Sequence, residues 1–151
     1  MDPQGETEED RLRRNLNELL QELRVAQAGV QILFGFLLAV TFTESYLRGT
    51  GFQQTVHLIT VLFSVSAIAL LTAPAAWHRM LFRHGQRQRI LRISNTFALA
   101  GMACLAAAMT GTVLLLTDVI VGNWMASVFA ALVALGFGVL WFALPLRYRR
   151  D

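Results

Sequence analysis

The chain alternates between long apolar stretches and short polar clusters. Four stretches have the length and composition of membrane spans, over about residues 25–46, 52–77, 90–117 and 123–146. Each exceeds the roughly 20 residues that cross a hydrocarbon core of about 30 Å. Buried helices of a soluble protein are the alternative, but no amphipathic helices remain to cover such a core. The pattern therefore predicts an all-α, polytopic membrane protein with a four-transmembrane-helix bundle.

The region before the first span divides into two parts. Residues 1–10 read MDPQGETEED, which lacks apolar periodicity and predicts a disordered acidic tail. From Arg11 to Leu23 leucines recur at spacings of three and four, which predicts an amphipathic helical lead-in continuous with the first span. We therefore expect a transmembrane domain over 11–148.

The basic residues predict how the spans are oriented. All 13 are arginine, and twelve flank the first span's start, the connection between spans two and three, or the last span's end. Only Arg48 lies on the other side. Arginine-rich segments resist translocation, so we expect both termini in the cytoplasm and the protein in the inner (plasma) membrane.

Composition excludes several functional classes. Charged residues make up 15% of the chain, against about 25% in a soluble domain. The arginines flank apolar spans, so a nucleic-acid partner is not expected. Cys104 is the single cysteine, which rules out an internal disulfide. Nucleotide-binding glycine loops and the common catalytic motifs are missing from the sequence, so we expect no enzyme activity, no metal site and no cofactor.

Small residues predict how the spans pack, because lipid tails are as apolar as leucine and close backbone approach must hold the helices together. The last span carries small residues at every fourth position, and the third span does the same. We expect these two spans to cross closely, either within one chain or between copies. The residues are Ala126, Ala130, Ala134 and Gly138 on the last span and Ala103, Ala107 and Gly111 on the third.

Polar residues inside the spans are the best functional candidates, because such groups are costly in hydrocarbon unless paired. Gln27 and Gln31 lie in the first span, and His57 and Ser64 lie in the second. Two interpretations stay open. The residues line a hydrated path or ligand cleft between these helices, or they form interhelical hydrogen bonds that fix packing.

Charged candidates gather near the two ends of the spans. Glu44 and Asp118 lie toward the outer side, where they could meet His57 in a loose cluster able to bind a proton or, as the less favoured alternative, a divalent metal. At the inner side we expect either a surface charge network or recognition of anionic lipid headgroups by the arginine-rich loop 78–92. The inner candidates are Glu22, Arg24, His78 and Arg79, with Arg92 nearby.

Two motifs resemble a known family. They are Glu18-Leu19-Leu20-Gln21-Glu22-Leu23-Arg24-Val25-Ala26-Gln27, running on to Phe34, and Ala73-Pro74 followed by His78-Arg79 and Phe82-Arg83. The chain resembles, over about 15–147, small four-helix bacterial membrane proteins of unknown function. The resemblance implies the fold and the membrane location, and no active site. Members are sometimes labelled sodium:proton antiporters automatically, yet no carboxylate lies near any midplane of this chain, where such an antiporter normally needs one.

Two functions remain in view. The first is a non-enzymatic membrane module or partner subunit, associating with copies of itself or with another membrane protein. The alternative is a small oligomeric ion or proton transporter or channel. A water-filled cavity shared by Gln31, His57 and Ser64 would favour transport, whereas direct and dry hydrogen bonds would favour the module.

Overall fold

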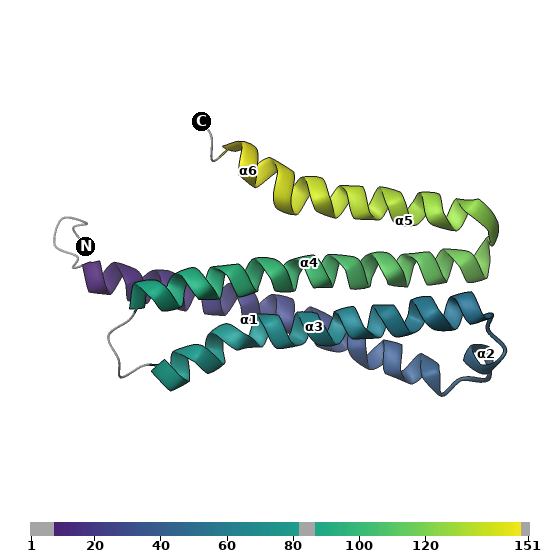
Figure 1. Ribbon diagram of the computed structural model, residues 1–151, viewed down its shortest axis with the longest axis horizontal. Coiled ribbons are helices and arrows are strands. Elements are labelled where there is room, and N and C mark those ends of the chain that lie inside the picture. Colours follow the sequence, from purple (N-terminus) through teal and green to yellow (C-terminus); the bar gives the residue numbers. More distant parts are fainter. Residues whose placement is uncertain (1–7, 82–86, 149–151) are drawn as a thin grey trace.

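The computed structural model describes residues 8–81 and 87–148, which are helical apart from short connections. In chain order the elements are α1 (Glu8–Thr41), α2 (Glu44–Leu47), α3 (Gly51–Leu81), α4 (Arg87–Ile120), α5 (Asn123–Phe137), the π-helical η1 (Gly138–Ala143) and α6 (Leu144–Tyr148). The last three form one rod, so the described residues make four long helical rods and the single turn α2 (Figure 1).

Each rod contains a segment long and apolar enough to cross a membrane. These segments are Asn17–Thr41, Gly51–Trp77, Ile93–Ile120 and Trp124–Tyr148. The predicted all-helical bundle with four spans is confirmed. The amphipathic lead-in is also continuous with the first span, because α1 runs unbroken for 34 residues, or about 51 Å at 1.5 Å per residue.

Two boundaries differ from the sequence prediction. Glu8–Asp10 belong to α1 and not to a disordered tail, while residues 1–7 lie outside the described residues. The first helix also ends at Thr41, and Tyr46 lies in the separate turn α2. The break occurs because Thr43 is extended and caps α2, its Oγ1 accepting a hydrogen bond from the Tyr46 backbone N–H at 3.3 Å.

Helices α1, α3 and α4 form the packed part of the bundle, with α5 leaning on α4 (Figure 1). Buried positions repeat at spacings of three and four along α3, which is the pattern of a helix buried along one seam. The buried residues of this seam are His57, Thr60, Ser64, Ala67, Leu71 and Pro74. The core between the three helices is built from Leu23, Val30, Ala67, Leu71, Ala98 and Leu105.

The closest helix pair is α3 with α4, because two glycines of α4 face α3. A Cβ added at Gly101 would lie 2.8 Å from two side-chain atoms of Leu71 and 3.2 Å from its backbone nitrogen. A Cβ at Gly111 would overlap Thr60 Oγ1. Small residues thus bring the backbones together, as expected, but mainly between the second and third spans.

The expected close crossing of the last two spans holds only over half their length. Ala126 and Ala130 are buried against α4, whereas Ala134 and Gly138 are exposed. The rod starts from a tight turn at Gly122, whose φ of 66° favours glycine, and then diverges from α4 toward the chain's C-terminus (Figure 1). The predicted stripe of four small residues is therefore an interface at one end and open at the other.

Candidate functional site

His57 is a buried residue near the α2 end of the bundle, with 5% of its surface exposed. Its Nε2 lies 3.3 Å from Thr41 Oγ1 of α1, and its ring makes an edge contact with Tyr46, with centroids 4.9 Å apart. The Thr41 hydroxyl also lies 3.2 Å from the Leu37 carbonyl oxygen. Sequence reasoning missed Thr41 and Tyr46, which together tie α1 and α2 to α3.

Ser64 lies at the centre of α3 with none of its surface exposed. Its hydroxyl donates to the Thr60 carbonyl oxygen at 3.0 Å, and the Thr60 hydroxyl donates to the Val56 carbonyl oxygen at 2.7 Å. Both hydroxyls are therefore satisfied within their own helix. Small polar side chains bonded in this way let α4 approach closely without leaving unpaired groups in the bilayer.

Gln27 bonds directly to the backbone of α3. Its Nε2 donates to the Leu71 carbonyl oxygen at 2.6 Å, three residues before the buried Pro74. A proline inside a helix cannot donate to the carbonyl four residues earlier, and its ring bends the helix. Helix α3 does bend in its last third (Figure 1). The carbonyl that loses its intrahelical donor to Pro74 is that of Leu70, and the Gln27 amide donates to the next carbonyl, that of Leu71, in the bent part of α3.

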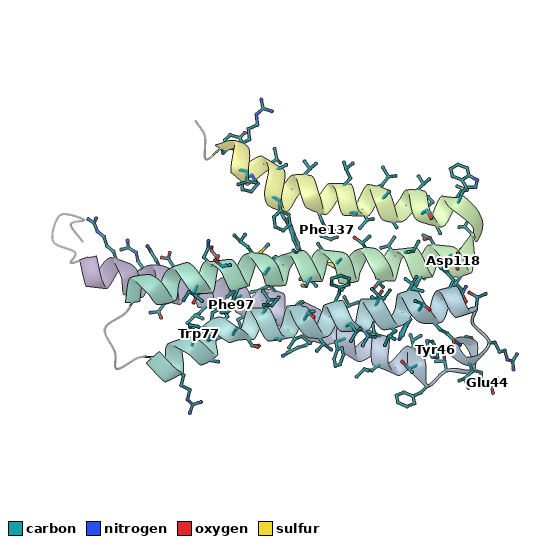
Figure 2. The ribbon with its side chains drawn as sticks, in the orientation of Figure 1. Glu44, Tyr46, Trp77, Phe97, Asp118 and Phe137 are labelled. Atoms are coloured by element: carbon teal, nitrogen blue, oxygen red, sulfur yellow. The ribbon has the colours of Figure 1, made fainter. Side chains whose placement is uncertain are left out.

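The candidates at the α2 end divide between separate interactions. Glu44 forms an exposed ion pair with Arg48 at 3.0 Å, and Asp118 Oδ2 accepts a hydrogen bond from Gln53 Nε2 at 2.9 Å. Figure 2 places Glu44, Tyr46 and Asp118 at this end. Across residues 8–81 and 87–148 no group of three His, Cys, Asp or Glu side chains could hold a metal ion. The possible cluster of Glu44, His57 and Asp118 is therefore not formed.

At the opposite end, Glu22, Arg24 and Arg79 are exposed on the bundle surface. Within the part of the chain that the structure describes, none of the three makes an ion pair. The side chains of His78 and Arg92 lie outside the described residues, so the predicted network with them stays a prediction. Trp77 of α3 meets Phe97 of α4 at this level, with ring centroids 5.7 Å apart (Figure 2).

Gln31 faces away from the bundle and therefore cannot share a cavity with His57 and Ser64. At 100° per residue it lies on an outward arc of α1 about 80° wide that is small or polar throughout. We call this surface the polar arc; its residues are Asn17, Gln21, Arg24, Ala28, Gln31, Gly35 and Ala39, all exposed.

The exposed surface next to the polar arc is mainly apolar, although Glu18, Glu22 and Gly29 also lie on it. Val25, Ile32, Phe36 and Val40 occupy an adjacent arc, which we call the apolar arc, and between 44% and 75% of their surface is exposed. Large apolar side chains suit contact with lipid. If lipid alone covered the outer surface of α1, both arcs would be expected to carry apolar side chains. The small and polar residues of the polar arc therefore call for a different neighbour.

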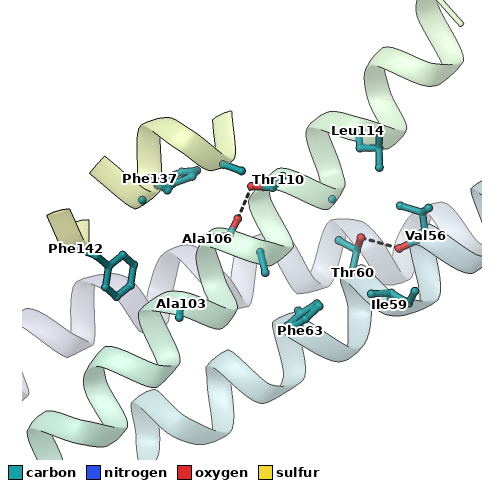
Figure 3. A pocket seen from close by; sticks show the side chains of 14 residues that line it. Val56, Ile59, Thr60, Phe63, Ala103, Ala106, Thr110, Leu114, Phe137 and Phe142 are labelled. Carbon is teal, nitrogen blue, oxygen red and sulfur yellow. Dashed lines mark hydrogen bonds between the residues drawn. The ribbon is translucent and has the colours of Figure 1, made fainter. Parts of the chain in front are cut away.

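A lateral groove opens where the last rod leaves α4 (Figure 3). It has a volume of about 540 Å³, with small residues of α4 forming its floor and aromatic residues of the last rod forming its wall. The Thr110 hydroxyl in it donates to the Ala106 carbonyl oxygen at 2.8 Å, and Thr60 is satisfied as described above. The groove thus presents apolar surface. Its lining includes Phe63, Ala103, Ala107, Gly111, Phe137 and Phe142.

These features describe an all-helical chain with four helices long and apolar enough to span a membrane. Among its described residues Gln27, His57, Thr60 and Ser64 are hydrogen-bonded, whereas the buried Ser94 hydroxyl has no partner and Gln31 is exposed and unpaired. The model described as "Family of unknown function (DUF6328)" matches residues 5–145. The chain belongs to this family, which agrees with the resemblance to uncharacterised membrane proteins found in the sequence. No curated protein and no solved structure matches the chain.

Proposed function

We propose that this protein is a non-enzymatic membrane module that acts as a partner subunit, associating with another transmembrane helix in the plane of the bilayer. The polar arc of α1 is the contact surface. The protein resides in the inner (plasma) membrane with both termini in the cytoplasm, a proposal supported by the arginine distribution. It also agrees with the start of α1 and the end of α6 lying at one end of the bundle (Figure 1).

The observation that carries this proposal is the environment of Gln31. This residue lies well inside the Asn17–Thr41 span, is exposed, and makes no hydrogen bond to any described residue. An amide facing hydrocarbon without a partner costs roughly 2–7 kcal/mol. A neighbouring helix would remove that cost, because side-chain amides hydrogen-bond well between membrane helices.

The contacts of His57 and Ser64 favour this module over the transporter alternative. Both side chains are buried and bonded directly to protein groups, whereas Gln31 is exposed on the outer surface of α1. The lateral groove presents apolar surface and is lined by α3, α4 and the last rod. Purified protein in liposomes is therefore expected to carry no sodium-dependent proton flux, and a flux abolished by His57→Ala would favour transport instead.

The module is tested by site-specific photocrosslinking in native membranes. A benzophenone amino acid replaces Ala28 on the polar arc or, as the matched control at similar depth, Val25 on the apolar arc. We expect a protein adduct from position 28 that is lost in Gln31→Leu and kept in Gln31→Asn, and lipid adducts from position 25. Lipid adducts alone at both positions would refute association through α1.

A further inference from the structure

The polar arc has the chemical properties of a self-complementary surface. We infer that its occupant is a second copy of this chain, which forms a two-fold dimer through α1 in the bilayer. The inference rests on the proposed function and narrows its partner to this protein itself. The key contact is Gln31 of one protomer with Gln31 of its partner.

The amide of Gln31 fits this partner because it carries both a donor and an acceptor. Two copies inserted in the same orientation are related by an axis along the membrane normal, so their α1 helices run parallel and both Gln31 residues lie at one depth. Each amide then donates to the other, and neither is left unpaired. Any other partner would have to present a suitable polar group at that same depth.

The residues beside Gln31 allow the two backbones to approach. Ala28 lies one turn before it and Gly35 one turn after it, so both are on the same face of α1. A Cβ placed at Gly35 meets nothing within 4 Å in the single chain, because this glycine serves no contact inside the bundle. Small residues on both sides of a polar one are the usual composition of a membrane helix interface.

In a parallel pair of α1 helices the two Arg24 side chains lie at the same depth, so the repulsion between their positive charges must be offset. Arg24 lies seven residues from Gln31, or about 10 Å along the axis toward the chain termini. The long side chain can reach the headgroup region, where lipid phosphates offset the repulsion between two guanidinium groups. The dimer is therefore expected to be stronger with anionic lipid than with zwitterionic lipid alone.

The test uses disulfide crosslinking of purified protein in liposomes of phosphatidylcholine and phosphatidylglycerol at low protein density. With Cys104 replaced by serine, single cysteines are placed at Ala28→Cys and Gly35→Cys on the polar arc. Val25→Cys and Ile32→Cys on the apolar arc are the controls, each three residues away from its counterpart. Thermal unfolding of every variant in detergent confirms that the bundle is intact.

We expect disulfide-linked dimer from the polar-arc cysteines at several times the yield of their controls. Adding Gln31→Leu to Ala28→Cys should weaken association about three- to thirtyfold, as expected for loss of an interhelical hydrogen bond, and Gln31→Asn should preserve it. Equal yields from both arcs, or no effect of Gln31→Leu, would overturn the dimer.

The two proposals can fail separately. If the purified chain gives no crosslink while native membranes still give a Gln31-dependent adduct of another protein, the dimer proposal is wrong. The proposal of a membrane module that binds another helix is then kept. If neither experiment gives a protein adduct, both proposals are wrong.

Discussion

The close approach of α3 and α4 at Gly101 makes the bundle sensitive to a single methyl group. In a Gly101→Ala variant, the new Cβ would lie 2.8 Å from Leu71 Cγ and Cδ2 and 3.2 Å from the Leu71 nitrogen. Leu71 is completely buried in the core between α1, α3 and α4, so its side chain can move only by displacing its neighbours. The backbone contact cannot be relieved by a rotamer change, and the helices must separate.

The expected loss follows from two opposing contributions. Overpacking a well-packed interior costs about 1–3 kcal/mol. Alanine favours a helix over glycine by about 1 kcal/mol, which offsets part of that cost. Gly29→Ala isolates the packing contribution, because it makes the same change where nothing lies within 4 Å. The two variants should therefore differ in free energy of unfolding by about 2 kcal/mol, or roughly thirtyfold in the equilibrium constant.

The measurement is reversible unfolding in mixed micelles, followed by circular dichroism. Gly111→Ala provides a second comparison, because its added Cβ would meet the Thr60 side chain. Thr60→Ala should rescue much of the loss in Gly111→Ala, whereas Leu71→Ala should not rescue Gly101→Ala, whose clash includes backbone. If Gly101→Ala is as stable as Gly29→Ala, the close crossing of α3 and α4 is refuted.

Two further predictions concern the contacts of α3 and α4 with their neighbours. Gln27→Leu should lower the free energy of unfolding by about 0.6–2 kcal/mol in the same assay. The loss should be smaller in a Pro74→Ala background, where the helix is regular. An equal loss in both backgrounds would show that the Gln27 hydrogen bond does not depend on the bend at Pro74. Ala130→Leu should destabilise the bundle by about 1–3 kcal/mol, because Ala130 is only 7% exposed. Ala134→Leu should be tolerated, because Ala134 is exposed beside the lateral groove. Equal thermal stability of these two variants would contradict the divergence of α5 from α4.

The candidate site shows where pattern reasoning stops. The sequence identified Gln31, His57 and Ser64 as polar groups inside spans, because a residue's position within a long apolar stretch can be read directly from the sequence. It placed them provisionally around one interface, yet Gln31 faces outward while the other two are buried on α3. The rotation of a helix about its axis depends on packing against its neighbours, and a polar stripe on a membrane helix does not by itself say whether it faces the bundle or the outside.

The amino-acid sequence by itself determined the four long apolar helices and the absence of acidic residues from the middle of each apolar stretch. It placed the boundaries of the last three spans to within about three residues but the first span, Asn17–Thr41, five to eight residues too late. These properties depend on local composition, because every backbone polar group in hydrocarbon must be satisfied within its own helix. Only the tertiary structure decided that α3 and α4 form the closest pair, that Gln27 bonds to the bent part of α3, and that α5 leaves α4 to open a groove. These depend on which small side chain meets which neighbour, since close contact between particular residues, and not expulsion of water, selects among helix pairings inside a bilayer.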